Sequence, residues 1–214
     1  MAKTYRVNEV FLSLQGEGIR VGTSNIFVRF SGCNMECDLE PGPKSPGGFA
    51  CDTEFVSGRT TTLEELEEWV HVQVETAGGV DPKWLILTGG EPGLQVDYEF
   101  IHFWHNQGYR LAIETNGTIE LPYAQGMPRL DWITLSPKVA EHAIKQLFAN
   151  ELKYVRGYGQ GIPKPAAQAE HLLISPAFDA MEIHPKTLEW CVKLCLQNPP
   201  WRLSLQQHKF MKVR

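Results

Sequence analysis

The sequence has no run of about 18 uninterrupted apolar residues, which is what a helix needs to cross a membrane. It has no excess of positive charge either: 20 Lys and Arg against 25 Asp and Glu give a formal charge of −5. That balance argues against a protein that holds nucleic acid by bulk charge. The first ten residues, MAKTYRVNEV, lack the apolar segment of a secretion signal. We therefore expect a cytoplasmic protein without membrane or nucleic-acid partners.

Repeats and low-complexity linkers are also lacking, and 214 residues suit one domain, which we expect to span residues 1–214. Cysteine is scarce, with five residues, and an odd count without a secretion signal argues against a disulfide framework. Cys191 and Cys195 lie four apart in a helical pattern, which favours plain core packing.

The other three cysteines, Cys33, Cys37 and Cys51, share one short stretch rich in loop-forming residues. Thiolates this close together on a loop are typical of a soft-metal or iron–sulfur site. Three thiolates on a [4Fe–4S] cluster leave one iron open to a small molecule. Spacing alone favours a zinc site equally, with a fourth ligand from His or Asp. Three inert buried cysteines fit less well, because the surrounding stretch is polar.

Apolar and alternating runs predict eight strands. They are Tyr5–Leu14, Asn25–Ser31, Trp84–Thr88, Arg110–Thr115, Trp132–Ser136, Glu151–Val155, His171–Ser175 and Trp201–Gln206.

Helical patterns separate several of these strands. A capping box from Thr62 to Glu65 begins one helix. Further helices are predicted around Phe100–Trp104, over Val139–Phe148 and around Leu188–Cys195. Strands that alternate with helices indicate a mainly parallel sheet, whose functional site lies at the carboxyl ends of the strands.

Three strands end in loops of unusual composition, namely Gly32–Cys33, Gly89–Pro92 and Ser136–Lys138. Two glycines at a strand end let a ligand approach the backbone, although a lone Gly-Gly is more often a plain turn. Glu114–Gly117 closes a further strand with an Asn-Gly turn signal.

Taken together, these motifs resemble those of radical S-adenosylmethionine (SAM) enzymes, and within them the 7-carboxy-7-deazaguanine synthase family. The matching segments run through most of the chain: Phe11–Gly18 (FLSLQGEG), Arg29–Cys37 (RFSGCNMEC), Cys51–Thr53 (CDT), Thr88–Pro92 (TGGEP), Glu114–Gly117 (ETNG), Ser136–Lys138 (SPK) and Gln206–Lys209 (QQHK).

One feature departs from the superfamily spacing C-x3-C-x2-C. Thirteen residues, Asp38–Ala50, separate Cys37 from Cys51, and Ala50 stands where an aromatic residue is usual. Six of the thirteen are Pro or Gly, which predicts a surface loop inserted at 38–50. Each doubling of loop length costs only about 0.6 kcal/mol, so the three thiols can still converge.

The resemblance implies an α/β fold, a partial (β/α) barrel of the radical SAM type reduced to about six core strands with few helices. It implies a lyase of queuosine or 7-deazapurine biosynthesis that converts 6-carboxy-5,6,7,8-tetrahydropterin to 7-carboxy-7-deazaguanine with loss of ammonia. The implied cofactors are a [4Fe–4S] cluster, SAM and Mg²⁺. A 5′-deoxyadenosyl radical takes a hydrogen atom from C6 of the pterin, and ring contraction follows. A homodimer and an electron donor such as a flavodoxin or ferredoxin are also implied.

The resemblance also assigns residues. The cluster ligands are Cys33, Cys37 and Cys51, and the magnesium ligand is Thr53. The substrate contacts are Leu14, Gln15, Gly16, Arg29, Thr88 and Arg214. The SAM contacts are Ala50, Gly90, Glu91, Glu114, Ser136, Pro137 and Lys138.

Plainer interpretations stand beside several of these assignments. Arg29 fits a structural ion pair with an Asp or Glu, and Thr53 fits a hydroxyl that caps the loop backbone. Lys138 fits an exposed charge at a strand end, and His208 fits a structural hydrogen bond. For the whole chain, the alternatives are another radical SAM enzyme, such as a glycyl-radical activase, and a zinc-binding module without catalysis.

Overall fold

The computed structural model describes residues 3–38, 40, 42, 45, 48–51, 53–178 and 182–213. Its helices and strands are β1 (Tyr5–Leu14), β2 (Ser24–Phe30), β3 (Arg59–Thr61), α1 (Leu63–Thr76), β4 (Trp84–Gly89), α2 (Tyr98–Asn106), β5 (Arg110–Thr115), β6 (Trp132–Leu135), β7 (Phe148–Arg156), β8 (Gln168–Pro176), α3 (Pro185–Gln197), β9 (Trp201–Leu203) and α4 (Gln207–Met211). Two 3-10 turns, Pro92–Leu94 and Glu141–Ala143, complete the set for these residues.

One curved, open sheet carries the fold, with strand order β3-β1-β2-β4-β5-β6-β7-β8-β9. β2 pairs in parallel with β4, and each strand from β4 to β9 pairs in parallel with the next. β1 pairs antiparallel with both β2 and β3. The sheet does not close, because β3 and β9 remain its two edges. The predicted partial barrel is therefore confirmed, with an antiparallel extension at its N-terminal edge.

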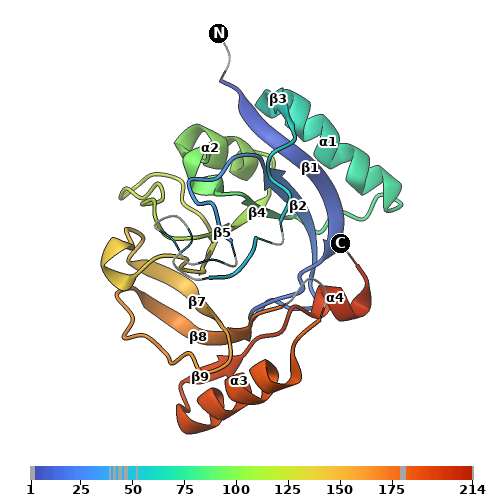
Figure 1. The fold of residues 1–214 in the computed structure, drawn as a ribbon. Helices are drawn as coiled ribbons and strands as arrows, with labels where there is room; N and C mark the ends of the chain where they lie inside the picture. The colour runs from blue at the N-terminus through green and yellow to red at the C-terminus, as the bar shows by residue number, and fades with distance from the viewer. Residues whose placement is uncertain are drawn as a thin grey trace.

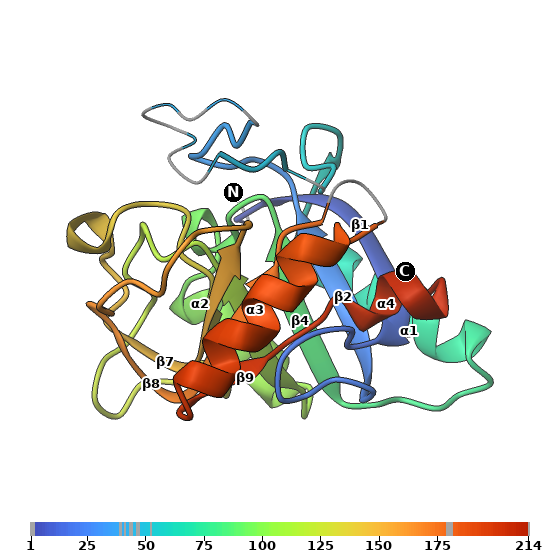
Figure 2. The same ribbon diagram turned by 60° about the horizontal axis from the view of Figure 1, so that its bottom comes forward.

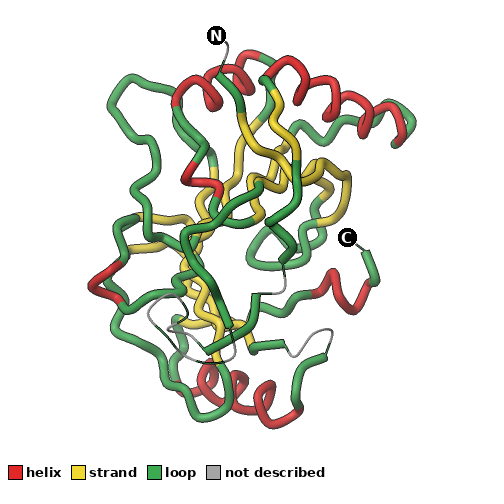
Figure 3. Tube along the Cα trace, turned by 45° about the horizontal axis from the view of Figure 1, so that its top comes forward, coloured by secondary structure: helices red, strands yellow, loops and turns green. Residues whose placement is uncertain are grey.

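Helices cover the outer face of the sheet and leave the inner face for the site. Figure 1 shows α1 and α2 against one half of the sheet and α3 against the other, with α4 between the β1 end and the β9 end. The tube in Figure 3 shows the same division, with the helices outside the strands. Within the described residues, no helix is long and apolar enough to span a membrane.

Alternation along the strands separates core from site. Ile26, Val28 and Phe30 of β2 join the large apolar cluster that packs under α1 and α2. Phe27, between them, belongs to a small separate cluster with Phe11 on the inner face. Because successive side chains in a strand point to opposite faces, Arg29 shares the inner face with Phe27. The same alternation gives each central strand an apolar outer face and a partly polar inner face.

Most predicted elements are confirmed. The capping box begins α1 as expected, since the Thr62 hydroxyl accepts from the Glu65 amide and the Glu65 carboxylate accepts from the Thr62 amide. The other strand and helix predictions hold with shifts of a few residues at their ends, apart from the helix over Val139–Phe148 and the last strand. The short edge strand β3 was not predicted.

The helix predicted over Val139–Phe148 is wrong. This segment forms only the 3-10 turn Glu141–Ala143 and then enters β7 at Phe148. The amides of Lys145 and Gln146 donate to the carbonyl of Gly117 instead of to a helical partner. Tertiary hydrogen bonds here override a local helical pattern.

The last predicted strand, Trp201–Gln206, is also too long. β9 ends at Leu203, and the chain then leaves the sheet and forms α4 from Gln207. The Gln207 amide donates to the carbonyl of Gly16, 2.8 Å away, so the tail is held against the end of β1.

Candidate active site

The inner-face polar residues meet at the carboxyl ends of the parallel strands. Arg29 of β2, Thr88 of β4, Glu114 of β5, Thr134 of β6 and Lys153 of β7 all line one cavity of about 350 Å³. Each precedes the end of its strand by at most a few residues. Parallel strands therefore deliver side chains from five separate segments into one space, as expected for this architecture.

Most of the predicted site residues line this cavity. They are Leu14, Gln15, Gly16, Arg29, Cys33, Cys37, Ala50, Cys51, Thr53, Thr88, Gly90, Glu114, Ser136 and Lys138. Two predicted SAM contacts, Glu91 and Pro137, are absent from the lining. Arg214 and Asp52 lie outside the described residues.

The three clustered cysteines come from the segment that follows β2. Figure 2 shows this segment above the edge of the sheet, over the carboxyl end of β2. The Cys51 amide donates to the Cys37 carbonyl over 3.3 Å, so the long insert returns to its own starting point. Cys33 and Cys37 are half-buried, and Cys51 is exposed. Cys37 and Cys51 thus come together across the thirteen-residue gap, as expected because the entropic cost of closing a loop grows slowly with its length.

The donor set distinguishes between a single metal ion and a cluster. Among the described residues, no three His, Cys, Asp or Glu side chains gather closely enough to hold one metal ion. A zinc ion needs four donors at about 2.0–2.3 Å from one centre. An iron–sulfur cluster makes no such demand, because each cysteine binds a different iron. The three thiols line one cavity, and the described residues hold no group that could bind a single metal ion.

The thiols also lie within electrostatic reach of one another. Burial raises the pKa of Cys33, and the charges of Cys37 and Cys51 act in the same direction. Burial also raises the pKa of Cys37, against the opposing charge of Lys138. Bringing three thiolates together is unfavourable unless a bound cation compensates them, and coordination to a metal deprotonates a thiol outright.

Cys191 takes no part in this site. It is fully buried on α3, where its thiol donates to the Arg156 carbonyl at 3.6 Å, and burial raises its pKa to about 11. Cys195 is partly buried and packs against the same apolar cluster. The sequence prediction of core packing is confirmed for both.

The two glycines after β4 are required by a close approach of two backbone segments. A Cβ at Gly90 would overlap the carbonyl of Gly32 and come 3.1 Å from the Cβ of Cys33. Gly89 has φ +118°, which side chains rarely adopt. From the sequence, the Gly-Gly pair fits either the approach of a ligand or a plain turn. The structure shows that Gly90 makes room for the start of the cysteine loop.

Glu91 is fully buried, at 0% exposure, and its carboxylate is hydrogen-bonded within the protein. Its carboxylate accepts from the Asn116 amide at 2.7 Å, the Thr115 hydroxyl at 2.8 Å and the Gly93 amide at 2.9 Å. Burial raises its pKa against these donors. Glu91 thus joins the loop after β4 to the end of β5, and its placement does not support the predicted direct contact with SAM.

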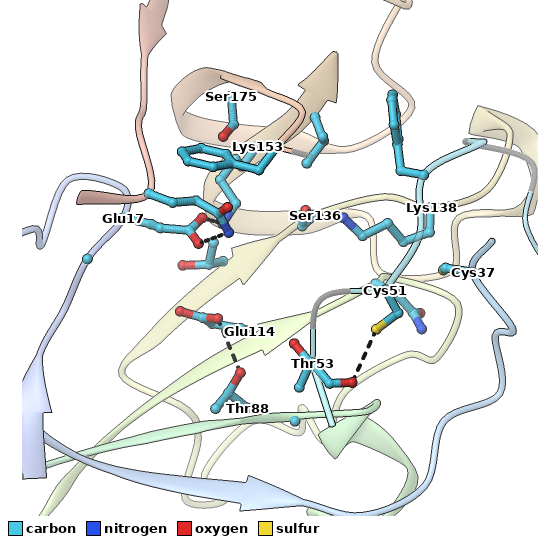
Figure 4. Close-up of a pocket in the computed structure, with 18 of the residues that line it drawn as sticks. Glu17, Cys37, Cys51, Thr53, Thr88, Glu114, Ser136, Lys138, Lys153 and Ser175 are labelled. Carbon is cyan, nitrogen blue, oxygen red and sulfur yellow. Dashed lines mark hydrogen bonds and ion pairs between the residues drawn. The ribbon is translucent and has the colours of Figure 1, made fainter. Parts of the chain in front are cut away.

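Glu114 organises the centre of the cavity. One carboxylate oxygen accepts from Gln15 Nε2 at 3.0 Å, and the other accepts from the Thr88 hydroxyl at 3.2 Å. Figure 4 shows the Thr88–Glu114 bond below the Glu17–Lys153 pair. The residue predicted to contact SAM is therefore bonded to two residues predicted to contact the substrate.

Arg29 has one paired and one unpaired donor. Its Nη1 lies 3.2 Å from the Glu9 carboxylate, so the ion pair considered from the sequence is present. Its Nε, however, is buried and has no hydrogen-bond partner among the described residues. Such a donor usually finds a partner, which here points to a ligand or water in the cavity.

The remaining predicted residues lie on the side of the cysteines. Lys138 Nζ donates to the Ser136 hydroxyl at 3.3 Å, and both line the cavity. The Thr53 carbonyl accepts from the Cys51 thiol at 3.5 Å. Thr53 and Ala50 therefore flank Cys51 at the rim, and Lys138 is partly buried and lines the cavity.

Sequence reasoning missed the buried ion pair between Glu17 and Lys153, which lines the same cavity. It also missed Ser175–Phe178, at the end of β8, and assigned no role to the tail residues Gln206 and Lys209. Two signals were present. Glu17 lies inside the LQGEG motif, and Lys153 interrupts an apolar strand, where an unpaired lysine is seldom buried.

No protein-family model matches the chain. The 7-carboxy-7-deazaguanine synthase of Caulobacter vibrioides is 38% identical over 97% of this chain and 98% of its own length. That of Bradyrhizobium diazoefficiens is 36% identical over 99% of this chain and 100% of its own length. The chain belongs to the 7-carboxy-7-deazaguanine synthase family.

A solved structure extends the likeness to the fold. The crystal structure of QueE from Escherichia coli superposes with a TM-score of 0.66 over 96% of this chain and 95% of that chain, at 23% identity. At that identity the likeness shows the partial-barrel fold, while the family rests on the curated relatives.

Proposed function

We propose that this member of the 7-carboxy-7-deazaguanine synthase family is a radical SAM lyase. It converts 6-carboxy-5,6,7,8-tetrahydropterin to 7-carboxy-7-deazaguanine with loss of ammonia, a step of queuosine or 7-deazapurine biosynthesis. One observation carries the proposal: three thiols and the inner-face polar residues of the sheet line the same cavity. Curated relatives of the same name that align over nearly the whole chain support it.

Cys33, Cys37 and Cys51 would hold a [4Fe–4S] cluster and leave one iron without a protein ligand. That iron is open to the amino and carboxylate groups of SAM. When bound, the cluster supplies the electron that cleaves SAM to methionine and a 5′-deoxyadenosyl radical. Ala50, beside Cys51, and Gly90, beside the Gly32 carbonyl, would offer backbone groups to SAM.

Ser136 and Lys138 extend this SAM-binding side of the cavity toward the cysteines. Lys138 lowers the pKa of Cys37 against the larger effect of burial, so its ammonium lies within reach of the cluster loop. Pro137 between them fixes the backbone angle without lining the cavity itself. Pro137 would therefore position its two neighbours rather than touch SAM.

The substrate side begins with Arg29. A planar guanidinium with an unpaired buried Nε suits a carboxylate, and the substrate carries one. The Glu9 pair would hold the side chain at the cavity wall. Leu14, Gln15 and Gly16 present the end of β1 to the same space.

Glu114 lies where the SAM side and the substrate side meet. Its two bonds fix Gln15 and Thr88 relative to each other. Phe11 and Phe27 stack with ring centroids 5.0 Å apart and form an apolar part of the lining. An apolar lining would exclude water from the place where the radical reacts with the hydrogen atom at C6 of the pterin.

Thr53 would be a ligand of Mg²⁺ at the rim. Magnesium prefers hard oxygen donors and keeps several waters, so one hydroxyl together with substrate oxygens makes a plausible shell. The support is its position two residues after Cys51 and its place in the cavity lining. The ion would offset the negative charge of the substrate.

The family resemblance supports two further proposals, a homodimer and an electron donor such as a flavodoxin or ferredoxin. Size-exclusion chromatography with light scattering tests the first. Replacing a chemical reductant with purified flavodoxin and its reductase tests the second.

The direct test of the function is an anaerobic incubation of reconstituted protein with SAM, reductant, Mg²⁺ and 6-carboxy-5,6,7,8-tetrahydropterin. Mass spectrometry should find 7-carboxy-7-deazaguanine, and SAM should be regenerated rather than consumed in step with product. Reductive SAM cleavage with no change of the pterin would point to another radical SAM enzyme. A colourless, zinc-containing protein would point to the non-catalytic alternative.

A further inference from the structure

A buried ion pair connects the floor of the cavity to the C-terminal segment. Lys153 of β7 pairs with Glu17, which follows β1, and their side chains are only 8% and 15% exposed. The other Glu17 oxygen accepts from Gln206 Nε2 at 2.8 Å. Lys153, Glu17 and Gln206 thus form a chain of contacts between three distant segments. Figure 4 shows the Lys153–Glu17 pair set apart from Cys37 and Cys51.

The segment that Gln206 introduces packs closely on the end of β1. The Gly18 amide donates to the Ser204 hydroxyl at 3.0 Å. A Cβ at Gly16 would overlap the ring of His208, so this glycine admits the histidine. Gln206, His208 and Lys209 all line the cavity. The tail residues 204–213 therefore form part of the cavity wall, held by groups that include the buried pair.

Each charge of the buried pair compensates the other, which packing alone would not do. Removing one partner of a buried ion pair leaves an uncompensated charge, which costs more than the intact pair gains. Glu17 must remain an acceptor on both oxygens to serve Lys153 and Gln206 together. A protonated Glu17 would lose its charge attraction to Lys153 and would hold the tail less firmly.

We propose that Lys153 is a positioning residue for substrate binding, which holds Glu17 so that Glu17 and Gln206 fix the tail 204–213 against the cavity. The proposal rests on the proposed function for its kinetic consequence and on the geometry alone for its structural consequence. Lys153 acts here through Glu17, without itself having to touch the reacting atoms.

Several charged groups face this pair from neighbouring elements. Glu17 faces Lys153 and His208, and Lys153 also faces Glu114 and Glu151. Burial is the largest single effect and raises the pKa of Glu17, but Lys153, Gln206 and His208 together outweigh it, so the pKa of Glu17 is lowered. Without the ammonium, the strongest effect that opposes burial is lost, so the pKa of Glu17 should rise.

The structural test is hydrogen exchange of the reconstituted protein without substrate. In Lys153→Met, amides of residues 204–213 should exchange at least about tenfold faster than in wild type, because a buried pair is broken. Gln206→Leu should loosen the same amides while leaving the Lys153–Glu17 pair intact. Lys153→Arg, which keeps the charge, should restore much of the protection. The matched control is Lys145→Met at an exposed lysine, which should match wild type.

The kinetic test separates binding from chemistry. Lys153→Met should raise KM for the pterin at least about tenfold and change kcat much less, because a loosened wall weakens binding. Its KM should also fall as the pH rises, as Glu17 regains its charge, whereas the wild-type KM should depend less on pH. Lys153→Arg should lower the elevated KM.

The outcomes distinguish this proposal from the proposed function. Wild-type tail protection in Lys153→Met and in Gln206→Leu would overturn the positioning role, whatever the reaction. A raised KM in Lys153→Met with an unchanged tail would overturn it too, because Lys153 would then act on the substrate directly. If wild type itself makes no product, the proposed function fails, while the exchange experiment still decides the role of Lys153.

Discussion

The two sides of the cavity are built in opposite ways. In the side formed by Glu17, Lys153 and Glu114, Lys153 and Glu114 stand on strands and Glu17 follows β1 directly; the side is mostly buried and pairs its charges within the protein. The side formed by Cys33, Cys37 and Cys51 is held by loops and is partly exposed. The first forms its contacts within the protein, whereas the second brings three thiols to the cavity, and no group of described side chains there could hold a single metal ion. The comparison suggests that the protein prepares the substrate side in advance and that the cofactor completes the other.

The largest expected effect comes from the cysteines. Replacing Cys33, Cys37 or Cys51 by Ala should abolish cluster-dependent SAM cleavage, because each thiolate would hold a separate iron. The measurement is the yield of 5′-deoxyadenosine under reducing, anaerobic conditions. Cys195→Ala is the matched control and should cleave SAM like wild type. Full iron content and activity in Cys51→Ala would show that the long-spaced cysteine is not a ligand.

Thr53→Val should remove most turnover, together with its dependence on added magnesium. Loss of an outer-shell partner of a metal site typically costs about 10- to 100-fold in metal affinity or activity, and loss of a direct ligand should cost at least as much. The cluster should still form, which absorption spectroscopy can check. If this variant keeps wild-type activity and the same magnesium response, the hydroxyl only caps the loop.

Arg29→Lys keeps the charge but loses the planar fork. Substrate binding should weaken about 10- to 100-fold, matching the roughly 1.5–3 kcal/mol of charged hydrogen bonds. Uncoupled SAM cleavage should survive, because it needs only the cysteine side of the cavity. Binding is measured by titration with the pterin. Unchanged affinity would assign Arg29 to its ion pair with Glu9 alone.

The smallest expected effect on chemistry is that of Glu91→Ala, which tests whether this residue is structural. Three buried donors would lose their acceptor, so the free energy of unfolding should fall by about 1–3 kcal/mol. Thermal unfolding measures the loss, and exposed Glu120→Ala is the control. A variant of wild-type stability with impaired SAM binding would instead restore the direct contact expected from the sequence.

The sequence predicted the strands well because their apolar alternation is dictated by burial. It predicted the start of α1 to the residue, because a capping box is a local device. It failed over Val139–Phe148, where the amides bond to distant Gly117, and at the tail, which bonds to Gly16. Local patterns do not contain partners that tertiary structure supplies.

The same division applies to the site. The cysteines and glycines were found because they stand in motifs, and Arg29 because an arginine interrupts an apolar strand. Lys153 carries the same signal, but its partner Glu17 lies 136 positions away. Glu91 was assigned to a ligand because its motif suggested one, whereas only its three internal donors reveal what it does here.

The central claim is that three thiols on one side of this cavity hold a cluster with an open iron. The most direct measurement is iron and sulfide content of the anaerobically reconstituted protein, with electron paramagnetic resonance of the reduced form before and after SAM. The account predicts about four irons and four sulfides per chain, and a signal that changes when SAM binds. One zinc per chain without iron, or a cluster signal indifferent to SAM, would contradict it.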